Sequence, residues 1–379
     1  WLVAASPYSD IRNKINFAIC WNDLKQYSTL KCKNLYCYIQ SAGNLSLDLL
    51  PRKLICKYIQ SASETTREIS FNLYDFHKYN QILTNKNDLL YKNINSIPDD
   101  FLIWLIGFIE GDGAIQTYSD KFKFVLTQKE SNVLYLIQNI LGIGKVVHYP
   151  QGKYNNKNDF YRLIVTKNSH ILLLTYLLNG NLAINSRINQ LSHWINLLNI
   201  KSIIKLNNKN IKLINKPVDI SLNDPWLSGF TDAEGCFNIS IENNRRYSSN
   251  QRIKLRYLLD QKDEIILNKI KNLFSLGKVT LRNNTNGVYR YTITGLKGNY
   301  KIISYFNKYP LYTKKSISYN SYNKVYNMLI NKEHLTEEGL MKIRRIKTNM
   351  SINNSLTTKT GRKSYKLKDK DIVRYFYFK

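Results

Sequence analysis

The sequence predicts an α+β fold in which two similar halves are joined in one chain. Three observations lead to this prediction. A stretch that ends in a carboxylate and a glycine occurs twice, at Leu105–Gly113 and at Leu227–Gly235. Alternating apolar and polar residues follow each copy, as they do in strands with one buried face. The same succession of segments then continues after both copies, and such an internal repeat indicates two units of one architecture.

Each copy of this stretch predicts a short buried helix, because its apolar run is far shorter than the ~20 residues that span a bilayer. Small residues four positions apart fall on one face of each helix and let two backbones approach closely. These residues are Gly107 and Gly111 in the first copy, and Gly229 and Ala233 in the second. We therefore expect the two helices to pack against each other, with Asp112 and Glu234 side by side where they end.

The two acids at the helix ends indicate a cation site. A carboxylate is unfavourable at the negative end of the helix macrodipole, and two adjacent carboxylates repel each other unless a cation lies between them. Oxygen ligands near phosphate suit Mg²⁺, and paired divalent ions can stabilise both oxygens of an in-line phosphodiester displacement. One copy alone would indicate only a structural helix with a solvated acid at its end. Two copies with an acid at the same position favour the metal site.

These two stretches resemble the paired signature of the LAGLIDADG homing endonucleases and of the related intron-encoded maturases. The resemblance covers roughly residues 96 to 350. It implies that the eighth-position acids, Asp112 and Glu234, are the catalytic pair and bind Mg²⁺ or Mn²⁺. The implied metal site includes the ninth-position glycines, Gly113 and Gly235. The second copy has Glu where the name pattern has Asp.

The same resemblance implies further active-site residues. A glutamine near the attacking water corresponds to Gln128 in the first half and to Gln261 in the second. A lysine near the scissile phosphate matches Lys314 or Lys315, and the sequence leaves both open. The first half keeps only one charge at the matching place, Arg187, so the two halves of the site are not expected to be equivalent.

The chain is expected to have four parts. Residues 1–95 form an N-terminal leader, which is either disordered or packed in part on the first half through Ser70–Tyr79. Residues 96–215 form the first half, and residues 216–350 form the second half with a C-terminal helix. Residues 351–379 form a basic tail that either adds affinity for nucleic acid or is solvated without a role.

Each half is expected to run helix, two strands, helix, two strands, helix. The first half has strands and a helix at Ala114–Tyr118, Lys121–Thr127, Asn132–Leu141 and Tyr161–Thr166. The matching segments of the second half are Cys236–Ile241, Arg252–Asp260, Glu264–Phe274 and Tyr289–Thr294. Extra residues around Asn243–Gln251 lengthen its first hairpin. Expected helix starts are Asp99 or Asp100 as the first cap, and Asp224 as the second cap with Pro225 at the first helical position.

Cations follow one face of the predicted strands in both halves. They are Lys121, Lys123 and Arg162 in the first half, and Arg252, Lys254, Arg256 and Arg290 in the second. One such face alone would indicate a solvated surface, but matching faces predict a DNA-binding saddle of two antiparallel sheets. In the major groove Arg and Lys read guanine, and Gln and Asn read adenine. Gln116, Asn238 and Ser240 are therefore candidate base readers.

The composition points to a polyanionic partner. The 379 residues carry a formal net charge of +29 at pH 7, which favours nucleic acid. No apolar segment is long enough to span a bilayer, and we expect no membrane association. Lys, Asn, Ile and Tyr are abundant and have A/T-rich codons, which favours an organelle genome and a mitochondrial location. The chain begins with Trp1, so we expect a fragment or a product translated in frame with an upstream segment.

Two functions from different classes remain open. The first is a site-specific double-strand DNA endonuclease, acting as a monomer with an internal pseudo-two-fold axis. The second is an RNA maturase that binds its host intron, because RNA recognition also relies on backbone charge. The paired acids favour cleavage, since a pure maturase need not keep them. A transcription-factor-like binder would not explain paired acids at helix ends.

Overall fold

The computed structural model describes residues 70–90, 97–118, 121–152, 159–201, 210–246 and 250–356 of the chain. The expected leader up to residue 69 and the expected basic tail from residue 357 lie outside the described residues. Among the helices described, none combines the length and the apolar composition needed to cross a membrane.

The first half is built on one four-stranded antiparallel sheet with the strand order β1-β2-β4-β3. Its strands are β1 (Gly113–Tyr118), β2 (Lys121–Gln128), β3 (Lys145–Tyr149) and β4 (Phe160–Val165). Its helices are α3 (Tyr74–Asn85), α4 (Asp99–Asp112), α5 (Asn132–Leu141), α6 (Asn168–Leu178) and α7 (Asn185–Ile200). Because α4 leads directly into β1, the end of this helix lies at the edge of the sheet.

The second half repeats this plan with the strand order β5-β6-β8-β7. Its strands are β5 (Gly235–Asn243), β6 (Gln251–Gln261), β7 (Lys278–Leu281) and β8 (Tyr289–Thr294). Its helices are α8 (Trp226–Glu234), α9 (Glu264–Phe274), α10 (Leu296–Lys308), α11 (Lys315–Ile330), the short 3₁₀ helix η2 (Glu333–Leu335) and α12 (Glu337–Leu356).

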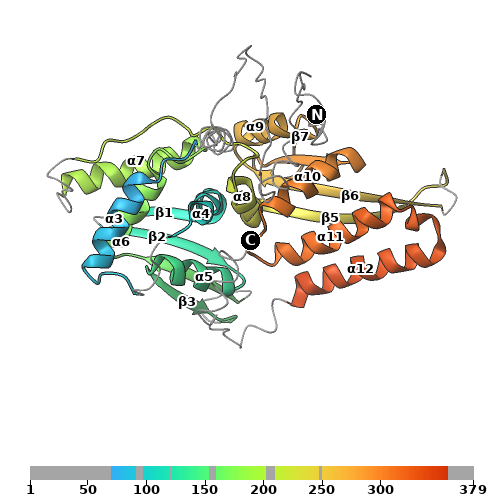
Figure 1. Ribbon diagram of the computed structural model, residues 1–379, viewed down its shortest axis with the longest axis horizontal. Coiled ribbons are helices and arrows are strands. Elements are labelled where there is room, and N and C mark those ends of the chain that lie inside the picture. The colour runs from blue at the N-terminus through green and yellow to red at the C-terminus, as the bar shows by residue number, and fades with distance from the viewer. Residues whose placement is uncertain are drawn as a thin grey trace, which may run out of the picture. The chain divides into compact units, whose positions relative to one another are not determined.

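The predicted α+β class with two matching halves is confirmed. The motif helices α4 and α8 pack against each other in the centre, with one sheet on either side (Figure 1). The first hairpin of the second half is longer, as predicted: β5 and β6 have 9 and 11 residues, where β1 and β2 have 6 and 8.

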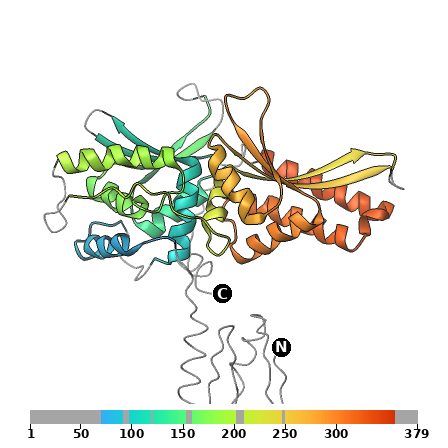
Figure 2. The same ribbon diagram turned by 90° about the horizontal axis from the view of Figure 1, so that it is seen from above.

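Strand alternation separates a buried face of each sheet from an outward face. In β6 the residues Leu255, Tyr257 and Leu259 are buried, while Arg256 and Asp260, on the opposite face, remain partly exposed. Helices α9, α10 and α11 cover the buried face of this sheet. Figure 2 shows the yellow strands β5 and β6 on one side of the second half and its orange helices on the other. The outward face is therefore left to polar and charged side chains.

The motif helices begin slightly differently from the prediction. Pro98 stands at the N-cap of α4, and both predicted capping acids lie inside its first turn, where the positive end of the macrodipole favours carboxylates. Pro225 takes the N-cap position of α8 rather than the first helical position. Asp224 still accepts a hydrogen bond of 3.0 Å from the N–H of Trp226. Because proline has no N–H, it fits either place at a helix start.

Two peripheral helices complete the halves. The segment that includes Ser70–Tyr79 packs on the first half through α3, whose buried Tyr79 lies 5.3 Å from Tyr176 of α6 between ring centroids. Helix α12 packs on α11 and runs to Leu356, past the predicted end near Met350. Ile343 and Met350 of α12 are buried in the core, so packing anchors the helix up to its predicted end.

Candidate active site

The two motif helices touch through their backbones. A Cβ atom on Gly229 would stand 1.8 Å from the carbonyl oxygen of Trp104, and one on Gly107 would stand 2.1 Å from that of Trp226. Atoms cannot approach so closely, so any side chain at either glycine would push the helices apart. The absence of side chains at these two positions therefore sets how near the C-terminal ends of α4 and α8 come.

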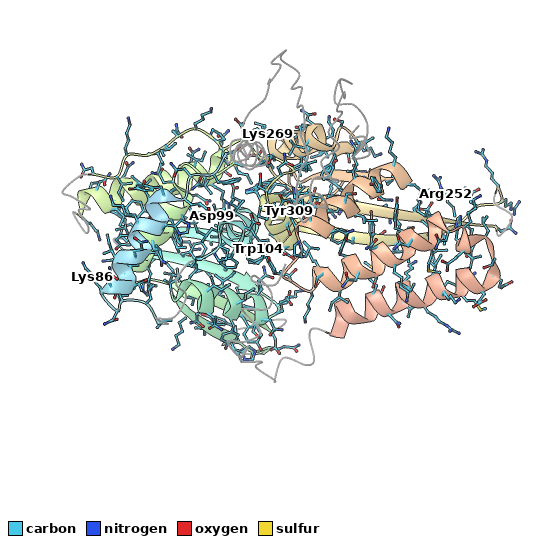
Figure 3. All side chains as sticks on the ribbon, viewed as in Figure 1. Lys86, Asp99, Trp104, Arg252, Lys269 and Tyr309 are labelled. Atoms are coloured by element: carbon cyan, nitrogen blue, oxygen red, sulfur yellow. The ribbon has the colours of Figure 1, made fainter. Side chains whose placement is uncertain are left out.

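Two tryptophans link the helices by hydrogen bonds to buried acids. Trp104 of α4 donates through Nε1 to Asp232 of α8 at 2.9 Å, and Trp226 of α8 donates to Glu110 of α4 at 2.7 Å. Figure 3 labels Trp104 in this central region. The exposed fractions of Glu110 and Asp232 are 0% and 2%, so neither acid reaches solvent. We refer to these two hydrogen bonds as the crossed acid–tryptophan pairs.

Each buried acid also holds the start of a later helix. Glu110 accepts hydrogen bonds of 2.8 Å from the N–H groups of Ala183 and Ile184, which immediately precede α7. The matching acid of α8 accepts bonds from the N–H groups of Tyr312 at 2.8 Å and Thr313 at 3.2 Å, just before α11. These bonds explain how a carboxyl group is tolerated in the core.

The sequence reasoning did not single out these acids or tryptophans as site residues. A signal was present, because Glu110 and Asp232 stand at the same place in the two copies, as do Trp104 and Trp226. An acid inside an apolar helix needs buried hydrogen-bond partners. Its recurrence at one position of a repeat therefore indicates a structural contact between the copies.

A cationic side chain donates hydrogen bonds to carbonyl oxygens at the C-terminal end of each motif helix. Arg187, in α7, donates hydrogen bonds of 3.0 Å to the carbonyl oxygens of Glu110 and Gly111. Lys315, in α11, donates from Nζ to two carbonyl oxygens at the matching end of α8, at 2.5 and 3.1 Å. Both cations complement the negative end of the macrodipole. Of the two lysines that the sequence left open, the structure therefore places the side chain of Lys315, not Lys314, in this position.

The neighbouring lysine is held by the opposite half. The N–H of Lys314 donates a hydrogen bond of 3.0 Å to Glu130, which lies in the turn after β2. The matching acid of the second half, Asp263, instead caps its own helix α9 by accepting from the N–H of Ile266 at 3.1 Å. Glu130 of the first half thus helps to fix the start of α11, and with it Lys315. Asp263 accepts its hydrogen bond from within the second half.

The two candidate metal ligands end their helices next to each other. Asp112 is the last residue of α4 and Glu234 is the last of α8. The Cγ atom of Glu234 lies only 3.2 Å from where a Cβ on Gly111 would stand. Gln128 donates a hydrogen bond of 2.5 Å to Asp112, whereas the amide nitrogen of Gln261 is 3.5 Å from Glu234. The site therefore contains a glutamine on each side, but with different contacts.

The glycines that follow the acids shape the turn from helix to strand. A Cβ on Gly113 would stand 2.6 Å from the carbonyl oxygen of Ile109, and one on Gly235 would stand 2.7 Å from that of Thr231. Each carbonyl belongs to the last turn of the preceding helix. A side chain at either position would therefore prevent the chain from turning at the acid.

Burial raises the pKa values of both carboxyl groups. Burial is the larger cause for Glu234, and repulsion by Asp112 adds to it, so that its pKa rises to about 7. Burial also raises the pKa of Asp112, against the opposing effects of Lys315, Gln128 and Arg187. Carboxylates that are partly enclosed and repel each other gain stability from a further cation.

The donor set fits a hard divalent ion with few protein ligands. Mg²⁺ takes one or two carboxylates and fills its remaining positions with water and substrate oxygens, as Asp112 and Glu234 would allow. Among the residues that the structure describes, no group of three or more His, Cys, Asp and Glu side chains is placed to enclose a metal ion. The side chains therefore suit an ion shared with substrate rather than one caged by protein.

On the second-half sheet, three of the four predicted outward cations, Lys254, Arg256 and Arg290, are paired with acceptors. Arg256 donates through Nε and Nη2 to the side-chain oxygen of Asn238 at 3.0 and 2.8 Å. Lys254 forms an ion pair with Glu242, which also accepts a hydrogen bond of 3.3 Å from Ser240. Two of the candidate base readers thus lie beside the cations on one face of the sheet.

The outward face of the first-half sheet is built differently. Lys121 and Lys123 have no carboxylate partner among the described residues. The guanidinium of Arg162 lies over the rings of Tyr149 and Phe160, 5.0 Å from each centroid. Its Nε is buried without a hydrogen-bond partner in the described part of the chain.

The remaining predicted contacts occupy the same outward faces. Gln116 is exposed in β1, directly opposite Lys123 of β2. Arg252 lies near the far end of the β5–β6 hairpin, well away from the central helices (Figure 3). Arg290 lies in β8, opposite Asp260 of β6. Among the described residues, none of these three side chains forms a hydrogen bond or an ion pair with Asp112 or Glu234.

Comparison with known sequences finds intron-encoded proteins. The family model described as "LAGLIDADG endonuclease" matches residues 227–326. The "Uncharacterized cox1 intron-2 37.2 kDa protein" of Schizosaccharomyces pombe is 31% identical over 271 residues, which cover 70% of this chain and 78% of that protein. "Probable intron-encoded endonuclease 4" of Neurospora crassa is 32% identical over 66% of this chain, which spans only 44% of that relative. "Intron-encoded RNA maturase bI4" of Saccharomyces cerevisiae is 27% identical over 46% of this chain and 26% of its own length.

Solved structures share the fold. The LAGLIDADG meganuclease I-AabMI, bound to uncleaved DNA, matches 66% of this chain and 98% of its own, with a TM-score of 0.50 and 24% identity. The meganuclease I-SmaMI, bound to uncleaveable DNA, matches 65% of this chain and 97% of its own, with a TM-score of 0.52 and 18% identity. At this level of identity the likeness establishes the arrangement of the two halves alone.

Proposed function

Because the chain belongs to the LAGLIDADG endonuclease family, we propose that it is an intron-encoded, site-specific double-strand DNA endonuclease. The observation that carries this proposal is the placement of Asp112 and Glu234 at the joined ends of two helices, between two sheets with cationic faces. The chain spans less than half of one curated relative, so the reaction proposed is that of the described halves.

We infer that the two acids, with the backbone at Gly113 and Gly235, hold Mg²⁺ or Mn²⁺. A divalent ion bound there would offset charge on the phosphodiester and favour ionisation of a water molecule. The chain's own groups orient the reaction. Gln128 fixes the carboxylate of Asp112 by its hydrogen bond of 2.5 Å.

Lys315 and the second glutamine complete the proposed site. Lys315 is held at the end of α8 by two carbonyl oxygens and keeps positive charge near both acids. Charge fixed in advance beside a phosphate stabilises the transition state more than charge that must reorganise. Gln261 lies further from its acid than Gln128 does, so its amide remains more available to a water molecule.

The target is proposed to be duplex DNA lying across both outward sheet faces. A two-stranded ribbon fits the major groove, and the cations on both faces would contact base edges and phosphates. The chain would act as a monomer, because each half supplies one motif acid and the two-fold relation is internal. We propose a mitochondrial location, from the A/T-rich codon bias and from the relative named for a cox1 intron.

The decisive experiment incubates the purified chain and Mg²⁺ with duplex DNA that carries the uninterrupted exon junction. Cleavage of both strands near the junction is expected, with no cleavage of the same DNA when the intron interrupts it. Asp112→Asn and Glu234→Gln should each lower cleavage by about 100- to 1,000-fold while leaving binding nearly intact, because the acids hold metal rather than bases. Equal loss of binding and cleavage in these variants would contradict the assignment.

The second candidate function is that of an RNA maturase. It is favoured by the relative named an RNA maturase, which matches nearly half of this chain. A maturase would bind its folded host intron through backbone charge and shape and would not need the two carboxylates. Splicing of the host intron that is unchanged by Asp112→Asn, together with no cleavage of junction DNA by the parent chain, would move the assignment to RNA.

A further inference from the structure

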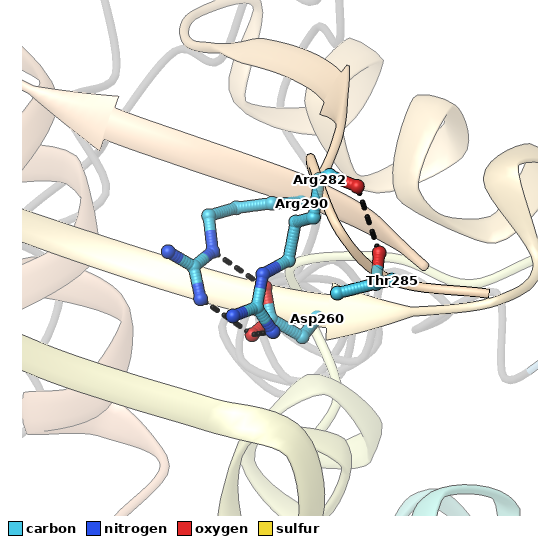
Figure 4. A network of polar contacts seen from close by, with 4 residues as sticks. All are labelled: Asp260, Arg282, Thr285 and Arg290. Atoms are coloured by element: carbon cyan, nitrogen blue, oxygen red, sulfur yellow. Dashed lines mark hydrogen bonds and ion pairs between the residues drawn. The ribbon is translucent and has the colours of Figure 1, made fainter. Parts of the chain in front are cut away.

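One acid on the outward face of the second-half sheet holds two arginines. Asp260 accepts hydrogen bonds from Nε and Nη2 of Arg290 at 2.6 and 2.7 Å. It also accepts one from Nη1 of Arg282 at 2.9 Å (Figure 4). All three side chains are partly exposed, with 27% of the Asp260 side chain and 32% of the Arg290 side chain accessible. The network therefore faces the region where DNA is proposed to lie.

Arg256 on the neighbouring part of the sheet is held in the same way. Its Nε and Nη2 both donate to the side-chain oxygen of Asn238. In Arg256 and in Arg290, one lateral edge of the guanidinium is thus occupied by an acceptor from the protein. The end of the fork, formed by one N–H of Nη1 and one of Nη2, has no acceptor among the described residues and can bind another one.

The free end of such a fork matches the O6 and N7 acceptors of guanine. A guanidinium that is already oriented loses less conformational freedom on binding. The acceptors of Asn238 and Asp260 bind only its lateral edge, so its other end can still bind a base. We propose that Asp260 and Asn238 are positioning residues that aim Arg290 and Arg256 at two guanines of the DNA target. This inference rests on the proposed function.

The first half lacks this arrangement at the matching places. Thr127 stands opposite Arg162, where the second half has Asp260 opposite Arg290. Arg162 lies instead over two aromatic rings that stack on each other. Lys123 takes the place of Arg256, and an ammonium group cannot form the two parallel bonds of a guanidinium fork. Fixed guanine recognition is therefore confined to the DNA under the second half.

The strand register gives the spacing of the two guanines. Arg256 pairs with Thr294 of β8, four residues along that strand from Arg290. At ~3.3 Å per residue the two arginines lie roughly 13 Å apart along the strand. Base pairs rise ~3.4 Å each, so the two guanines should be separated by other base pairs and not adjacent.

The test selects bound duplexes from a DNA library randomised across the binding site, using the full chain without divalent metal so that no DNA is cleaved. The parent chain should enrich guanine at two separated positions. Asp260→Ala should lose the preference at one of them and Asn238→Ala at the other, each by about 5- to 150-fold. Thr127→Ala is the matched control from the first half and should keep both preferences.

Total affinity distinguishes positioning from a structural role. Removing the acid of Asp260 also removes repulsion of phosphate, so binding to random-sequence duplex should stay equal or rise while specificity falls. Asp260→Asn keeps the size of the side chain and provides a folded variant if the alanine variant is unstable. It should weaken the same guanine preference.

The outcomes separate the inference from the proposed function. If the parent chain enriches a sequence and both Asp260 variants enrich it equally, the positioning role is wrong and the endonuclease proposal stands. Loss of total binding and specificity together in Asp260→Asn would likewise overturn the positioning role. If the parent chain enriches no sequence, the proposed function fails, and this inference fails with it.

Discussion

The two halves of the molecule are nearly equivalent at the helix interface and clearly different on their outward sheet faces. At the interface, each half supplies a glycine in backbone contact, a tryptophan bonded to a buried acid, and a cation on the helix end. On the sheet faces, acceptors of the second half hold Arg256 and Arg290, while the first half has lysines without carboxylate partners among the described residues.

Packing constrains some parts of the repeat more than others. Few side chains fit where two backbones are in contact, so both copies have glycine at that position. The outward faces meet only solvent or a partner, so they are free to diverge. Since symmetric proteins bind palindromic sites, unlike faces are suited to an asymmetric target.

The first prediction compares the two cations at the helix ends. Lys315→Met should lower cleavage by about 100-fold and Arg187→Met by about tenfold. The reason is that Lys315 lowers the pKa values of both Asp112 and Glu234 more than Arg187 does. Removing Lys315 therefore raises both pKa values, and the pH midpoint of cleavage should move up by about one unit.

Cleavage rates measured from pH 6 to 9 check this prediction, with Lys314→Met as the control. Lys314 contributes its backbone N–H to Glu130, so its side-chain variant should cleave with the parent pH profile. Equal effects of Lys314→Met and Lys315→Met would remove the distinction between the two lysines.

The second prediction compares the crossed acid–tryptophan pairs. Trp226→Phe should destabilise the fold by about 2–3 kcal/mol and Trp104→Phe by about 1–2 kcal/mol, because each leaves a buried carboxyl short of a donor. The acid that Trp104 contacts keeps a second donor on the same oxygen, from the N–H of Tyr312. The oxygen of Glu110 that Trp226 contacts has no other donor in the described residues.

Urea unfolding of the three tryptophan variants measures this difference. Trp194→Phe is the control, since Trp194 is equally buried but donates to a backbone carbonyl, that of Gln116. Its loss should cost less than either of the other two. A larger cost for Trp194→Phe would show that ring packing, rather than the bond to an acid, dominates.

The third prediction concerns stability against pH without divalent metal. Folding raises the pKa of Glu234 from 4.5 to about 7, chiefly through burial. The folded protein therefore keeps a proton that the unfolded chain releases within this window. The contribution of Glu234 to the free energy of unfolding is fully present below pH 4.5 and is lost as the pH rises through 7. This loss should amount to about 1–2 kcal/mol after solvent screening.

Melting temperatures from pH 4 to 9 test this sign. Glu110 has the same pKa of about 7 from burial, so Glu234→Gln should remove only part of the slope and Glu110→Gln another part. Added Mg²⁺ should flatten the part due to Glu234, because a bound cation favours the carboxylate. A slope of the opposite sign would contradict the burial of both groups.

The fourth and smallest prediction concerns the first-half face. Lys121→Ala and Lys123→Ala should each weaken DNA binding evenly across sequences and reduce the log–log salt slope by about one. Arg256→Ala should instead relax preference at one position. Binding measured against salt concentration on a one-base-substitution panel separates the two outcomes. If Lys123→Ala changes preference at a single position, the two faces do not differ in the way proposed.

Much of this architecture was predictable from the sequence because it rests on local periodicity. The repeated stretch gave two helices, the spacing of Gly107 and Gly229 gave their contact faces, and strand alternation gave the two sides of each sheet. Each of these features depends on residues within a few positions of one another. The same periodicity placed Asp112 and Glu234 at the helix ends.

Which distant side chains meet depends on the packing of whole elements. The choice of Lys315 over Lys314 depends on how the start of α11 is held by the opposite half. The partners of Asp260 come from the chain beyond β7, 22 residues away, and from β8, 30 residues away, and no local pattern links them. Periodicity determines the face on which a residue lies, but hydrogen bonds between faces depend on how whole elements pack, and that packing is not a local property of the chain.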